Sequence, residues 1–249
     1  MTGRRARVAV FRPDDDRLAD AVSLLEALGA EPVADPMLAV RPTGARPRTD
    51  ADFVLLTSKT GVELAGDAGW DPGAATVCAI GASTAESLRE HGYAPAVVPE
   101  EFSSAGLVDA LAKEVDGARV EVARSDHGSA TLLDGLNDAE AYVHETVLYR
   151  LVRPEGAGES ADLAAAGELD GALFTSSLTV EHFLDAADER GVREAAIAGL
   201  NESVVGAIGA PTRRTAEAAG IEVAVVPESA DFEELACTVV EAIVPSYHE

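Results

Sequence analysis

The chain is poor in aromatic residues, lysine and cysteine, and it lacks long apolar runs. Aromatic residues make up 4% of its 249 residues, so alanine, valine and leucine must fill most of any core. Cys78 and Cys237 lie in apolar stretches without ligand spacing, which predicts buried, reduced thiols. Because no run of 18 or more apolar residues occurs and the N-terminus has no apolar leader, we expect a cytoplasmic protein with no membrane partner.

The motifs of most cofactor-dependent enzymes are also missing. No GxGxxG turn, GxxxxGK[ST] loop or GxSxG elbow occurs, and the histidines show no metal-ligand spacing. The sequence therefore predicts no cofactor and no metal. An enzyme of this kind would act by positioning its substrate and through one or a few weak acids.

Acidic residues dominate the charge. The chain has 44 Asp and Glu against 19 Lys and Arg, a formal net charge of −25. Binding to nucleic acid is excluded on this ground, because a phosphate backbone needs a basic face. In dilute solution such a charge opposes compaction, whereas molar salt shortens the Debye length to roughly 3 Å. We therefore expect a halophilic protein and a monomer.

Much of the sequence occurs twice. VCAIGASTAESLREHGYAPAVVPEE (77–101) is repeated as VGAIGAPTRRTAEAAGIEVAVVPES (205–229), at a constant offset of 128. Two further pairs are VLLTSKTGVE (54–63) with ALFTSSLTVE (172–181), and RVAVFRP (7–13) with RVEVARS (119–125). Two copies of one α/β unit predict a two-lobed protein with a cleft, and small ligands bind in clefts.

Short apolar runs alternate with helical patterns in both copies. Near-continuous apolar strands followed by helices predict doubly wound, flavodoxin-like units with parallel sheets. Segments 41–49 and 152–162 are predicted to be linkers. The predicted strands include 7–11, 52–57, 76–80, 94–98, 119–123, 141–149, 171–175, 203–208 and 222–226.

Small hydroxyl residues follow several of these strands, at turns into helices. A helix N-terminus offers free N–H groups and a partial positive charge, and a hydroxyl adds a donor. Glycine at such a turn lets a ligand oxygen approach the backbone, so the four turns could together bind a polyanion. Ordinary helix caps are the alternative. The candidate binding residues at these turns are Ser58, Lys59, Gly81, Thr84, Ser176, Ser177, Gly209 and Thr212.

Two arginines occupy matching positions in the copies. Arg12 and Arg124 end the first strand of each copy, where a guanidinium could hold a ligand carboxylate in a bidentate fork. Surface ion pairs are the alternative in so acidic a chain. The run Asp14 to Asp16 could be a metal cluster, but an N-cap and an acidic first helical turn explain it better.

Taken together, these segments resemble the uroporphyrinogen-III synthase family. The most telling pieces are FTSS (174–177), AIGAPTRRTAEAAG (207–220), AIGASTAESLREHG (79–92) and ETVLYRLV (145–152). The resemblance covers nearly the whole chain. It implies two flavodoxin-like lobes joined by a two-stranded linker, with a cleft between them. Lobe one would comprise 1–37 and 154–249, and lobe two 38–153.

The resemblance also implies an activity. Members of this family cyclise hydroxymethylbilane, a linear tetrapyrrole, to uroporphyrinogen III with loss of water and inversion of ring D. The chain would thus be a cofactor-independent lyase of tetrapyrrole biosynthesis. The family's candidate proton donor aligns with Tyr149, and its substrate-contacting hydroxyls align with Ser58, Thr84, Ser177 and Thr212. A phenol carries its proton at neutral pH, although Tyr149 could instead be a packing residue.

Two other functions are compatible with parts of the sequence. A non-catalytic tetrapyrrole sensor of the same fold would be expected to carry an output domain, and the presence of Tyr149 with all four hydroxyl turns favours the enzyme. A sugar-phosphate isomerase would need a histidine or glutamate at a strand end, and none stands out.

Overall fold

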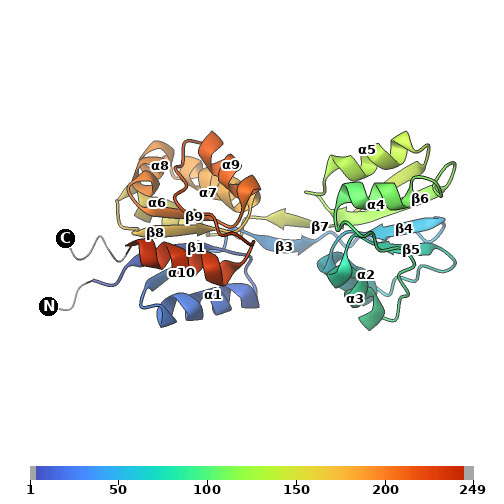
Figure 1. The fold of residues 1–249 in the computed structure, drawn as a ribbon, viewed down its shortest axis with the longest axis horizontal. Helices are drawn as coiled ribbons and strands as arrows, with labels where there is room; N and C mark the ends of the chain where they lie inside the picture. Colours follow the sequence, from blue (N-terminus) through green and yellow to red (C-terminus); the bar gives the residue numbers. More distant parts are fainter. Residues whose placement is uncertain (1–3, 244–249) are drawn as a thin grey trace. The chain divides into compact units, whose positions relative to one another are not determined.

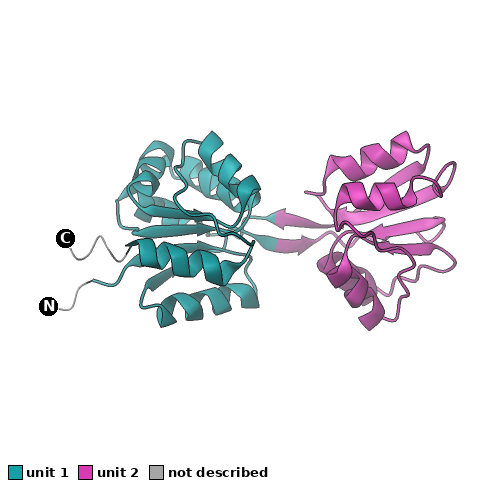
Figure 2. Ribbon diagram, viewed as in Figure 1, with its two compact units in different colours: residues 1–39, 152–249 teal, residues 40–151 magenta. Residues whose placement is uncertain are grey.

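The computed structural model describes residues 4–243, which form two compact units (Figures 1 and 2). Unit 1 comprises Met1–Ala39 and Val152–Glu249, and unit 2 comprises Val40–Leu151. Unit 1 is therefore built from two separate stretches of the chain. Each unit is a sheet with parallel strands between layers of helices, which confirms the predicted α/β class.

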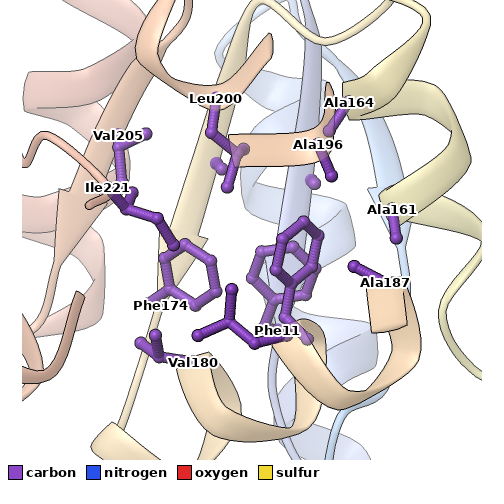
Figure 3. Packing of buried hydrophobic residues seen from close by; sticks show 14 of the residues in the cluster. Phe11, Ala161, Ala164, Phe174, Val180, Ala187, Ala196, Leu200, Val205 and Ile221 are labelled. Atoms are coloured by element: carbon purple, nitrogen blue, oxygen red, sulfur yellow. The ribbon is translucent and has the colours of Figure 1, made fainter. Parts of the chain in front are cut away.

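Unit 1 contains a four-stranded parallel sheet in the order β2-β1-β8-β9. Its strands are β1 (Arg7–Phe11), β2 (Glu31–Ala34), β8 (Gly171–Phe174) and β9 (Val204–Ala207). One face is covered by α1 (Asp16–Ala27) and α10 (Phe232–Ile243). The other is covered by α6 (Glu159–Ala165), α7 (Ser177–Glu189), α8 (Arg193–Asn201) and α9 (Ala210–Ala218). The rings of Phe11 and Phe174 stack at the centre of this second layer, 4.5 Å between centroids (Figure 3).

Unit 2 contains a five-stranded sheet in the order β3-β7-β6-β4-β5. Its strands are β3 (Ala39–Pro42), β4 (Phe53–Leu56), β5 (Thr76–Ala79), β6 (Arg119–Ser125) and β7 (Tyr142–Val152). Helices α2 (Lys59–Asp67) and α3 (Ala82–Glu90) pack on one face. Helices α4 (Ser104–Leu111) and α5 (Ala130–Asp138) pack on the other.

The two units are circular permutations of each other. The repeated sequences make β1 equivalent to β6 and β8 equivalent to β4, and the sheet orders agree once these pairs are matched. Unit 1 starts with β1, whereas the equivalent strand β6 comes late in unit 2. The first sequence copy is consequently divided between the two units.

Some predicted elements are wrong. The predicted strands 94–98 and 222–226 are reduced to single bridges, Val97 with Cys78 and Val225 with Gly206. Pro95 removes one N–H donor from the first of these segments, and Pro99 follows directly after it.

The predicted linkers are also partly wrong. Arg41 and Pro42 belong to strand β3, and the predicted linker 152–162 already contains the start of α6. The buried carboxylate of Asp35 holds that helix start, because it accepts hydrogen bonds from the backbone N–H groups of Gly158 and Ser160 at 2.8 and 2.9 Å. Helix α8 was not predicted.

Candidate functional site

Tyr149 and Ser58 meet near the carboxyl ends of β7 and β4 in unit 2. The Tyr149 hydroxyl donates to Ser58 Oγ at 3.0 Å. Ser58 is the N-cap of α2, and its Oγ also accepts the backbone N–H of Gly61 at 3.0 Å. Tyr149 is only 6% exposed, so its phenol approaches the turn from within the core. The structure thus brings two of the predicted site residues into direct contact.

The glycine turn of unit 2 lies beside an exposed aromatic ring. Gly81 follows β5 and precedes α3, so the first N–H groups of α3 have no side-chain cap from this position. Thr84, in the first turn of α3, is buried. A Cβ placed on Gly81 would lie 3.2 Å from Phe102 Cβ, yet Phe102 is 63% exposed. The sequence analysis did not single out Phe102, although this residue directly precedes Ser103, the N-cap of α4.

The two predicted cations of unit 2 have protein partners. Arg124 is buried, and its guanidinium donates to Glu145 Oε1 at 2.6 Å and to the carbonyl of Ser129 at 2.5 Å. It can therefore hold a ligand carboxylate only through its remaining N–H groups. Lys59 is exposed, with its Nζ 3.7 Å from Glu63 one helical turn away.

Unit 1 carries the matching hydroxyl and glycine turns. Ser176 caps α7 in a capping box, in which Ser176 and Thr179 each accept the other's backbone N–H at 3.2 Å. Ser177 is the first residue of that helix. Gly209 precedes α9 in the same way that Gly81 precedes α3, and Thr212 is buried in its first turn.

Arg12 lies at the carboxyl end of β1, with its guanidinium 4.3 Å from the centre of the Phe232 ring. Burial, followed by the charge of Arg17, lowers the pKa of Arg12 from its usual value. Within residues 4–243 its Nε has no hydrogen-bond partner, and the side chain forms no ion pair there. Arg12 is thus more available to an anion than Arg124, a difference that the sequence did not indicate.

Cys78 is buried as predicted, whereas Cys237 is only half-buried. Burial raises the pKa of Cys78 to about 12, and burial together with nearby acidic groups raises that of Cys237. Among the described residues, no group of three or more His, Cys, Asp and Glu side chains is arranged to hold a metal ion. The same part of the chain has no helix long and apolar enough to cross a membrane.

Doubly wound parallel units with glycine and hydroxyl turns beyond the strand ends define a class of ligand-binding α/β proteins. Within that class the family is shown by sequence. Residues 19–237 match the model of the family described as uroporphyrinogen-III synthase HemD. The chain belongs to the uroporphyrinogen-III synthase family.

Individual relatives agree with this assignment. A protein of Methanothermobacter thermautotrophicus, provisionally named a uroporphyrinogen-III synthase, is 33% identical over 240 residues, covering 89% of this chain and 92% of that protein. The uroporphyrinogen-III synthase of Chlorobaculum parvum is 28% identical over 67% of this chain and 66% of its own length. A crystal structure of the Thermus thermophilus enzyme has the same fold, with a TM-score of 0.67, 21% identity, and coverage of 97% of this chain and 99% of that one.

Proposed function

We propose that this protein converts hydroxymethylbilane to uroporphyrinogen III, with loss of water and inversion of ring D. The observation that carries the proposal is the contact between the Tyr149 hydroxyl and Ser58 Oγ in a member of this family. This contact would hold the Tyr149 hydroxyl, the proposed proton donor, in one orientation beside the N-terminus of α2. Carboxylates of the substrate can bind at such a helix N-terminus.

Tyr149 would act when the hydroxyl leaves the substrate's hydroxymethyl group. The C–O bond breaks, the phenol proton passes to the departing oxygen, and water is released. The methylene carbon of the resulting azafulvenium cation is then attacked by the substituted carbon of ring D. The spiro intermediate fragments and recloses, and the proton that ring D loses at the final closure returns to the phenolate. Ser58 can turn its hydroxyl hydrogen toward the phenolate that remains, because its oxygen is already held by the N–H of Gly61.

The other turns would hold the substrate's acidic side chains. Backbone N–H groups at the starts of α3 and α9 follow Gly81 and Gly209, where no Cβ blocks the approach of an oxygen. Arg12 adds a guanidinium without an internal ion pair among the described residues. Holding ring D inverted is a matter of geometry, and orientation alone can supply much of the rate.

The test supplies hydroxymethylbilane and separates the products by isomer. Type III product above the spontaneous type I background supports the proposal, and the same yield after exhaustive treatment with a chelator supports a cofactor-independent lyase. Type I product alone contradicts it. If the substrate nevertheless binds, the sensor alternative is favoured instead.

A further inference from the structure

A polar pair in unit 2 replaces an apolar pair in unit 1. The repeated strand sequences place Glu121 of β6 at the position of Ala9 of β1. The strand registers place His144 beside Glu121, and Val33 beside Ala9. Ala9 is buried in the apolar core of unit 1, with Val33 packed against that core. A carboxylate and an imidazole therefore occupy a position where the sister unit is hydrophobic.

A pocket accompanies this replacement. In unit 1, Ala161 and Ala164 of α6 belong to the same core cluster as Ala9. In unit 2 the segment between β3 and β4 instead brings Arg48 and Asp50 to this region, leaving a pocket of about 440 Å³. The pocket lies at the amino ends of β6 and β7, whereas Tyr149 lies near the carboxyl end of β7. It is therefore separate from the candidate active site.

Glu121 carries a hydrogen-bond acceptor that is not satisfied within the described part of the chain. Its Oε2 is 2.6 Å from His144 Nδ1, while Oε1 has no hydrogen-bond partner among residues 4–243. Both arginines in the pocket wall are paired with acidic residues, and one of these, Asp50, lines the pocket as well. Arg48 makes a bidentate pair with Asp50 at 2.8 and 2.7 Å, and Arg119 one with Asp52 at 3.2 and 3.0 Å. A buried acceptor without a partner is costly, so the pocket favours a ligand that donates a hydrogen bond.

His144 lies against this carboxylate. Glu121 forms part of the pocket wall, but its side chain is fully buried. The His144 side chain is 50% exposed and holds Glu121 Oε2 through Nδ1, so a ligand would reach the carboxylate only when this ring turns away. Tyr142, which is 70% exposed, also lines the pocket and offers an aromatic surface to the ligand.

We propose that this pocket binds a small organic cation whose amidinium or ammonium group donates to Glu121 and whose apolar body packs near Tyr142. A cation suits the carboxylate and can also interact with the face of the Tyr142 ring. The net charge of −25 further favours cations over anions. Neither the fold nor the family assignment requires such a site.

The experiment titrates the full-length protein with benzamidine and, separately, with benzoate, an anion of the same shape. Calorimetry measures affinity, and NMR of the His144 ring protons reports the location of binding. We expect benzamidine to bind and to shift the His144 signals, and benzoate not to bind. Absence of benzamidine binding, equal binding of benzoate, or unshifted His144 signals would each overturn the proposal.

Variants sharpen the result. Glu121→Gln keeps the size of the side chain but removes its charge, and we expect benzamidine to bind about tenfold more weakly, as for loss of one charged hydrogen bond. Glu114→Gln removes one exposed charge elsewhere in unit 2 and should not change the affinity. His144→Ala should keep or strengthen binding because it uncovers the carboxylate. Unchanged affinity in folded Glu121→Gln would refute the proposal, and the wild-type NMR test remains decisive if that variant does not fold.

Discussion

The serine that caps the helix after the equivalent strands β4 and β8 has different hydrogen-bond partners in the two units. Ser58 in unit 2 and Ser176 in unit 1 cap equivalent helices, but Ser176 is engaged by Thr179, whereas Ser58 receives the hydroxyl of Tyr149. Leu38 occupies the position of Tyr149 in unit 1, because it pairs with Pro13 as Tyr149 pairs with Ser125. The candidate acid is therefore present in one copy only. Under the proposed function, both copies would supply a binding turn, and only the turn of unit 2 would have an acid beside it.

The units also differ in how they cover their sheets. Unit 1 adds α6 and α8, which pack against each other over an alanine-rich layer. Unit 2 has a loop and a polar pocket at the corresponding place. This face is therefore covered by packed helices in unit 1 and carries a pocket in unit 2.

We expect the largest effect from a mutation that disrupts the packing of α6 against α8, a helix pair without a counterpart among the described residues of unit 2. A Cβ on Gly199 of α8 would lie 1.7 Å from the carbonyl oxygen of Ala164 in α6. Alanine normally favours a helix by about 1 kcal/mol over glycine, but this clash should outweigh that gain. We expect Gly199→Ala to lower the free energy of unfolding by roughly 3 kcal/mol or to prevent folding.

Denaturant unfolding in concentrated salt measures this difference. Gly191→Ala is the matched control, because Gly191 has a φ of +69° but an added Cβ would meet nothing within 4 Å. It should cost only about 1 kcal/mol, from backbone strain. Equal stability of the two variants would show that α6 and α8 are not in such close contact.

The next effect concerns the acid found only in unit 2. Tyr149→Phe removes the hydroxyl that contacts Ser58. We expect the rate of type III product formation to fall by about tenfold to a hundredfold, which is at or below the lower end of the usual contribution of a general acid. Tyr93→Phe is the control, since its hydroxyl bonds the carbonyl of Trp70 in the core of the same unit. Full activity in Tyr149→Phe would remove this residue from the mechanism.

Salt should act on both units together. At low ionic strength the net charge of −25 opposes compaction and repels an acidic substrate, so we expect activity to fall several-fold in dilute buffer. The activity and the unfolding midpoint should both be followed across a series of potassium chloride concentrations. Full activity in dilute buffer would refute the expectation that the protein is halophilic.

We expect the smallest effect from a mutation that makes the turn at Ser58 in unit 2 resemble the turn at Ser176 in unit 1. Gly61 occupies the position of Thr179, and a Cβ there would lie 3.1 Å from Ser58 Oγ and 3.4 Å from Leu148 Cδ1. Gly61→Thr should displace Ser58 by a few tenths of an ångström, and we expect about a threefold loss of type III product. The reverse change, Thr179→Gly, should lower stability by about 1 kcal/mol without affecting the isomer produced. Equal activities of these two variants would contradict the proposed asymmetry.

The sequence predicted the secondary-structure elements better than the contacts between side chains. Apolar runs located the main strands, because burial on both faces leaves a continuous pattern. Helix α8 was missed, since its alanines and glycine leave few large apolar side chains to mark a helical period. Ser58 was identified from its position at a strand-to-helix turn, and Tyr149 through the family resemblance. Their contact joins residues 91 positions apart and depends on strand order. The engagement of Arg124 by Glu145 was invisible for the same reason.

By itself, the sequence determined the parallel α/β class, the repeated turns and the excess of acid, because strand patterns, helix caps and charge are local or additive properties. The tertiary structure decided which strands became neighbours. That choice set Tyr149 against Ser58, left Arg12 without an ion pair among the described residues, and buried Glu121 beside His144. Such contacts follow from strand order and register, which bring together residues far apart in the chain.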